Sequence, residues 1–183
     1  IDDAHRNSGG RVIVPQGVFL SGSIVLKSGV ELHLERGSSL LGSTDRFDYT
    51  GLNRRLALVL ADGQSDIAIT GRGTIDGQGR ELALNTIELY HAGKIDDPNY
   101  SHRRHRTNEQ QRPQIIECVN CHRINISGVT IKNAACWVQT YSLCQDVTID
   151  RIWVESDAFW NNDGIDIEDC QNVRITNCDV NAA

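Results

Sequence analysis

The carboxylates between residues 161 and 169 are the side chains best placed for acid–base chemistry in this 183-residue chain. The segment reads Asn-Asn-Asp-Gly-Ile-Asp-Ile-Glu-Asp. If Ile165 and Ile167 point into a core, the alternation of a β-strand sends Asp166 and Glu168 to the opposite, solvent-facing side. Asp163 comes just before them, in an Asn-Asp-Gly turn signal where alternation does not apply. Neighbouring carboxyl groups in different surroundings can act as general acid and general base.

A repeated pattern indicates what positions this segment. The pattern is a Cys, two polar residues, and then apolar residues alternating with polar ones, and it starts at Cys121, Cys144 and Cys170. The intervals of 23 and 26 residues lie in the range of stacked structural repeats. We therefore expect the three cysteines to stack on consecutive coils. The apolar residues at the fourth position of each copy should form an inward ladder beside them, namely Ile124, Val147 and Val173.

The fold class follows from the short elements between these landmarks. Each repeat holds short β-branched runs of period two, broken by Gly, Asn and Asp, and no segment longer than about ten residues shows capped helical periodicity. A leucine-rich repeat would need a Leu and Asn framework, and an antiparallel sandwich would show less regular spacing. The sequence predicts an all-β protein, a right-handed parallel β-helix forming a single domain fragment over 1–183. We expect this solenoid to be incomplete at its C-terminal end.

An irregular stretch at about 80–112 interrupts the period and is interpreted as an insertion or long loop. It contains the densest basic cluster of the chain, in which His102, Arg103, Arg104 and Arg106 are candidate substrate-binding residues. A solvated loop is one interpretation. The other is a cationic rim that attracts a polyanionic substrate, because arginine matches the geometry of carboxylates.

Composition excludes several classes of function. The formal net charge of −6 disfavours nucleic-acid binding, which needs a basic surface, and no apolar run is long enough for a membrane span. The six cysteines are interpreted as buried thiols in preference to disulfides, a haem attachment site or a zinc site. The glycines of the 71–79 segment are interpreted as turn residues, because the dinucleotide fingerprint fails at Asp76. We expect no metal and no cofactor.

The acidic segment resembles the Asn-Thr-Asp-Gly-Ile-Asp motif of glycoside hydrolase family 28, the family of polygalacturonases and rhamnogalacturonan hydrolases. Other parts of the chain resemble the N-terminal coils of that family in the expected order. They are the segments 14–22, 26–34, 41–45 and 71–79, followed by Arg112 and Pro113. The resemblance covers essentially the whole chain.

The resemblance implies a pectinase that hydrolyses pectic polysaccharide or oligogalacturonide with inversion. In such enzymes the acid and base carboxyl groups stand about 6.5 to 9.5 Å apart, which leaves room for a water. Asp163 is the catalytic residue implied by the match, with Asn161 and Asp166 as supporting candidates. Asn162 replaces the usual Thr of the motif. The resemblance also implies a secreted or periplasmic protein, and we expect a monomer when the protein is complete.

In the family, the coil after this motif supplies a pair of adjacent aspartates, one of which is the general acid, and this pair is absent from the 183 residues. We therefore expect the chain to be the N-terminal part of a longer enzyme and to be inactive alone. Two alternatives remain open. One is a non-catalytic β-helical carbohydrate-binding or structural module, and the other is a pectate-lyase-like β-helix protein, which would require calcium.

Overall fold

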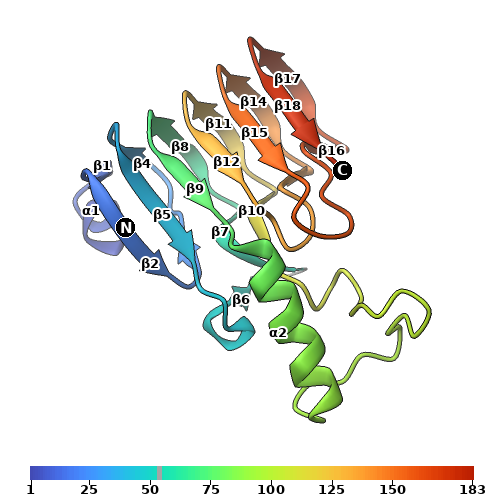
Figure 1. Ribbon diagram of the computed structural model, residues 1–183. Helices are drawn as coiled ribbons and strands as arrows, with labels where there is room; N and C mark the ends of the chain where they lie inside the picture. The colour runs from blue at the N-terminus through green and yellow to red at the C-terminus, as the bar shows by residue number, and fades with distance from the viewer. Residues whose placement is uncertain (53–54) are drawn as a thin grey trace.

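Three parallel β-sheets stack into a solenoid in the computed structural model, which describes residues 1–52 and 55–183. Figure 1 shows successive coils following one another from the N-terminus to the C-terminus, which lie at opposite ends of the stack. Each coil contributes one strand to each sheet, so neighbouring strands belong to successive coils. The architecture is a parallel β-helix, as the sequence predicted.

The sheets are named A, B and C. Sheet A consists of β1 (Gly10–Val14), β4 (Val30–Leu34), β8 (Ser65–Gly71), β11 (His122–Ser127), β14 (Gln145–Asp150) and β17 (Gln171–Thr176). Sheet B consists of β2 (Gly17–Ser21), β5 (Ser38–Gly42), β9 (Thr74–Asp76), β12 (Thr130–Lys132), β15 (Trp153–Ser156) and β18 (Asp179–Ala182). Sheet C consists of β3 (Ile24–Val25), β7 (Leu56–Asp62), β10 (Gln114–Val119), β13 (Gln139–Ser142) and β16 (Asp166–Glu168), with β6 (Thr50–Gly51) antiparallel to β7.

The predicted cysteine stack is present. The backbone oxygens of Cys121 and Cys144 accept hydrogen bonds from the first strand residues of the next coils, each at 2.9 Å. Cys170 donates its thiol hydrogen to the Tyr141 oxygen at 3.3 Å, and all six thiols of the chain are free. Burial raises the pKa of Cys118, which keeps that thiol protonated and unreactive.

The inward apolar ladder is also confirmed. Sheet A pairs its rungs in register across four coils, Ile67, Ile124, Val147 and Val173. The first three are buried, and Val173 is partly buried against the core. Such in-register stacking buries each apolar side chain between its copies on neighbouring coils, which is the main stabilising contribution in a solenoid.

The region at about 80–112 contains an element that the sequence did not predict. Helix α2 (Gly79–His91) has 13 residues, and together with the loop that follows it projects from the side of the stack (Figure 1). Its N-cap, Gln78, makes no side-chain capping hydrogen bond, so the usual start signal is missing. A Cβ at Gly79 would lie 2.1 Å from the Ala134 backbone. The sequence reasoning interpreted this region as an irregular insertion or loop and missed the helix, because packing of Leu82 against the core, and not a cap, fixes it.

The remaining helices are short. Helix α1 (Asp2–Arg6) lies at the N-terminal end of the stack, and η1 (Arg46–Asp48) lies in the loop between β5 and β6. Within the described residues, no helix is long and apolar enough to span a membrane.

Candidate functional site

The outer face of sheet C carries a polar stripe that ends at the acidic segment. Tyr141 points into the core and is fully buried, so its neighbours Thr140 and Ser142 lie on the outer face, where other groups cover them and they are only 1% and 3% exposed. The register places Asp166 beside Thr140 and Glu168 beside Ser142. The earlier coil adds Glu117 in register with Thr140. The stripe thus brings three carboxyl groups to one face over three coils.

The carboxyl group of Asp166 on this face has a strongly raised pKa. Burial, and then the negative charges of Asp163 and Glu168, raise its pKa to about 6, against a smaller opposing effect of Arg55. Its Oδ2 atom is buried and has no hydrogen-bond partner among the described residues. Both observations agree, because an unpartnered buried carboxylate oxygen favours the protonated form. Asp166 therefore lies on the outer face, as alternation predicted, but it is half-buried and can hold a proton near neutral pH.

Asp163 lies in the loop that leads into β16, and its side chain is exposed. The Val138 N–H donates to its backbone oxygen at 2.9 Å, which fixes the loop to the preceding coil. The next residue must be small, because a Cβ at Gly164 would lie 2.6 Å from the Val180 side chain. The carboxylate is thus presented to solvent from a fixed backbone, and it lies close enough to Asp166 to raise the pKa of that group.

Asn162 is the anchor of this loop. It is fully buried, and its Oδ1 accepts hydrogen bonds from the Ser156 hydroxyl at 2.8 Å and from the Ala158 N–H at 2.9 Å. Its Nδ2 donates to the oxygens of Ala134 and Cys136 at 3.0 and 3.2 Å. An amide can both donate and accept at these distances, whereas the hydroxyl of a Thr is shorter and carries a single donor hydrogen. Asn162 therefore ties the loop to the preceding coil through both ends of its amide.

Asn161 is held by two guanidinium groups. Its Oδ1 accepts from Arg106 at 2.6 Å and from Arg112 at 2.8 Å. Arg112 is only 1% exposed and also donates to the oxygens of Ala135 and Trp160 at 2.7 and 2.6 Å. The side-chain carbonyl group of Asn161 is thus already engaged within the protein, two residues before Asp163. The sequence had singled out Arg112 only as part of the resemblance, and not for this role.

The basic loop folds back onto the acidic segment. The guanidinium carbons of Arg104 and Arg106 lie 5.5 and 5.3 Å from the centre of the Trp160 ring, in the range of cation–π contacts. His102 packs edge-on against Tyr100 with 5.1 Å between ring centres. Arg103 is exposed. The four predicted rim residues are therefore not equivalent, and only Arg104 and Arg106 contact the loop that carries Asp163.

Arg55 and Trp137 were missed by the sequence analysis. The guanidinium carbon of Arg55 lies 3.7 Å from the centre of the Trp137 ring, and its charge acts on Asp166. The two residues come from different coils, so no local pattern connects them. Together they place a cation and an aromatic surface beside the carboxylates, which suits an anionic sugar ring.

The arrangement is suited to acid–base chemistry on an anionic carbohydrate. It combines an exposed carboxylate, a carboxyl group with a raised pKa, and a cation stacked on an aromatic ring. Among the residues that the structure describes, no group of three or more His, Cys, Asp or Glu side chains is placed to hold a metal ion.

Comparison with known proteins agrees with this geometry. A Polygalacturonase of Ralstonia solanacearum is 32% identical over 130 residues, which are 63% of this chain and 24% of that protein. The structure of a Yersinia enterocolitica Family 28 Exopolygalacturonase superposes with a TM-score of 0.81 at 26% identity, over 93% of this chain and 37% of that chain. A hyperthermoactive Exopolygalacturonase of Thermotoga maritima gives a TM-score of 0.75 at 28% identity, over 97% of this chain and 46% of that chain.

The match in length is partial. The chain spans about a third of the length of the curated relatives that it matches. Residues 7–183 match the sequence profile of Glycosyl hydrolases family 28. Since this match covers nearly all of the chain, and the fold is the parallel β-helix of the solved family members, the chain belongs to glycosyl hydrolases family 28.

Proposed function

We propose that this chain is part of an enzyme that hydrolyses glycosidic bonds of pectic polysaccharide with inversion, and that Asp163 activates the attacking water. The observation that carries the proposal is the exposure of Asp163 on an anchored loop beside the half-buried Asp166. A general base must reach a water at the substrate, and Asp163 is the solvent-facing carboxylate of the pair. Family membership supports a pectic substrate, polygalacturonan or rhamnogalacturonan.

Asp166 supports this role without replacing it. With its pKa raised to about 6, Asp166 holds a proton at weakly acidic pH. A neutral Asp166 places no negative charge beside the proposed base. We assign the proton that the leaving group requires to a general acid outside these 183 residues. The partial length of the match to the relatives supports that assignment.

The test compares two proteins in a pectin hydrolysis assay. The 183-residue chain should give no detectable reducing ends, whereas a form that is extended through later coils should hydrolyse polygalacturonate. Proton NMR of the first products should show the anomer opposite to that of the substrate. In the extended form, Asp163→Asn should remove most of the activity with little change in unfolding, because the substitution is nearly isosteric and exposed.

Asp169→Asn is the matched control, since Asp169 is also exposed and lies in the same segment. It should leave activity near the parent level. Full activity of the extended Asp163→Asn protein would refute the assignment of the base. Turnover by the short chain would show that the acid lies within the 183 residues.

The proposal also covers where the protein acts. Pectic polymers lie outside the cell that degrades them, so we place the protein in a secreted or periplasmic location. We also propose that the complete protein is a monomer. Cell fractionation and light scattering of the extended form test these two points.

A further inference from the structure

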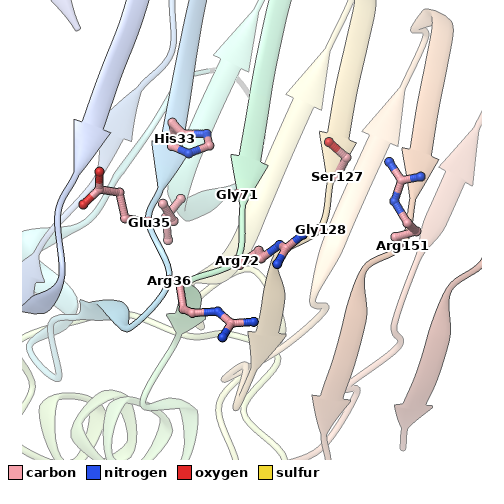
Figure 2. Close-up of a pocket in the computed structure, with 9 residues that line it drawn as sticks. His33, Glu35, Arg36, Gly71, Arg72, Ser127, Gly128 and Arg151 are labelled. Atoms are coloured by element: carbon pink, nitrogen blue, oxygen red, sulfur yellow. The ribbon is translucent and has the colours of Figure 1, made fainter.

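A second groove lies at the corner between sheets A and B, away from the carboxylates of sheet C. It has a volume of about 1060 Å³ and is lined by the ends of the sheet A strands and the turns that follow them. Figure 2 shows three arginines in it, Arg36, Arg72 and Arg151, each from a different coil. In a chain with a formal net charge of −6, a groove lined by three arginines is a local reversal of charge.

The arginines lie in the turns after sheet A strands but at different register positions, since continuing the strand pairing aligns Arg72 with Glu35 and Arg151 with Gly128. Arg36 comes two residues after β4, and Arg72 and Arg151 directly follow β8 and β14. Strands β4 and β8 are adjacent, and β11 lies between β8 and β14. With strands about 4.8 Å apart, the backbones that carry Arg72 and Arg151 are roughly two strand spacings apart. The three positive charges therefore lie along one corner of the solenoid, on three of four consecutive coils.

The coil between Arg72 and Arg151 presents no side chain at the equivalent turn, where Gly128 stands. A Cβ on Gly128 would lie 2.4 Å from the Gly71 oxygen, and a Cβ on Gly71 would lie 1.9 Å from the Leu34 oxygen. The close stacking of these turns therefore requires glycine. As a consequence, the floor of the groove is bare backbone, and a chain-like ligand can approach it closely.

The charges of the groove are available to a ligand. Arg36 and Arg72 are exposed, and within residues 1–52 and 55–183 neither forms an ion pair. Arg151 contacts Asp150 at 2.9 Å, and its side chain remains 70% exposed. Glu35 also lines the groove, but Figure 2 shows its carboxylate directed to the side opposite the arginines. The balance of the lining is positive.

We infer that this groove is a second binding site for a linear polyuronate, lying across the coils with its carboxylates on Arg36, Arg72 and Arg151. A guanidinium group binds a carboxylate through two parallel hydrogen bonds, and a row of them matches a polymer that bears one carboxylate per sugar. The choice of a uronate rests on the proposed function. The site holds the polymer on the protein and takes no part in bond cleavage.

Affinity electrophoresis of the 183-residue chain in gels that contain polygalacturonate tests the inference. The triple variant Arg36→Gln/Arg72→Gln/Arg151→Gln should bind about tenfold more weakly at low salt, because several exposed ion pairs are lost together. The control variant Arg80→Gln/Arg123→Gln/Arg174→Gln removes the same charge from exposed positions elsewhere and should bind like the parent. Glu35→Gln should bind more tightly than the parent, since it removes the one negative charge of the lining.

Equal binding by the two triple variants would overturn the site. A parent protein that polygalacturonate does not retard would also overturn the site. Equal retardation by dextran sulfate would overturn it too, because it would indicate simple ion exchange. Circular dichroism and urea unfolding of each variant show whether a loss of binding is a loss of folding. The assay requires no turnover, so binding through the groove together with a failure of the extended form to hydrolyse pectin would contradict the proposed function alone.

Discussion

Arg112→Lys is the substitution that best tests how the acidic loop is held. The Arg112 side chain is 1% exposed and makes four hydrogen bonds. Three go to the backbone oxygens of Thr107, Ala135 and Trp160 at 3.2, 2.7 and 2.6 Å, and the fourth goes to Asn161 Oδ1 at 2.8 Å. Lysine keeps the positive charge but replaces the planar fork by a single ammonium group.

The magnitude follows from the acceptors that lysine leaves behind. One ammonium group can reach about two of the four oxygens, because they surround a planar group from several directions. At least two buried acceptors then lose their partner, and each costs about 1 to 3 kcal/mol. We expect Arg112→Lys to lower the free energy of unfolding by roughly 2 to 6 kcal/mol. Part of this loss should appear as weaker oligogalacturonate binding, because Asn161 loses one of its two guanidinium donors near Asp163.

Urea unfolding followed by tryptophan fluorescence measures the first effect, and isothermal titration measures the second. Arg106→Lys is the matched control, since Arg106 donates to the same Asn161 atom at 2.6 Å but is partly exposed. Water can replace its bond, so a change of about 1 kcal/mol or less is expected. If Arg112→Lys unfolds within about 0.5 kcal/mol of the parent, as a surface change would, the anchoring role is refuted.

Two further predictions concern Asp166 on sheet C and the basic loop near it. The pKa of Asp166 is raised from 3.8 to about 6, so between these values the folded state holds more protons than the unfolded state, and the free energy of unfolding falls as pH rises. In urea unfolding, the free energy of unfolding of Asp166→Asn should therefore rise relative to that of the parent when the pH is raised from about 4 to about 7. The same difference between variant and parent at pH 4 and at pH 7 would contradict this. The double variant Arg103→Gln/Arg104→Gln should weaken oligogalacturonate binding and flatten the salt dependence of that binding. Lys94→Gln is the control. Unchanged affinity at low salt would favour the interpretation of this segment as a solvated loop.

The periodic features of this protein could be predicted from the sequence alone. The repeat beginning at Cys121, Cys144 and Cys170 fixed the coil length, and alternation fixed the side of the sheet on which Asp166 and Glu168 lie. Both are local properties, because strand periodicity is set by the backbone and each repeat carries its own pattern. The same reasoning missed helix α2, whose start depends on the contact of Gly79 with the Ala134 backbone and not on a local cap.

The candidate site depended on contacts between distant parts of the chain. The pairing of Arg55 with Trp137, the bonds from Arg112 to the loop of Asp163, and the return of Arg106 to Asn161 join residues from different coils or from the projecting loop. No sequence period relates these residues, since the loops between strands vary in length. The sequence by itself determined the ladder and the acidic motif. Only the tertiary structure decided which carboxyl group is buried and which is exposed, because desolvation and neighbouring charges exist only once the coils are stacked.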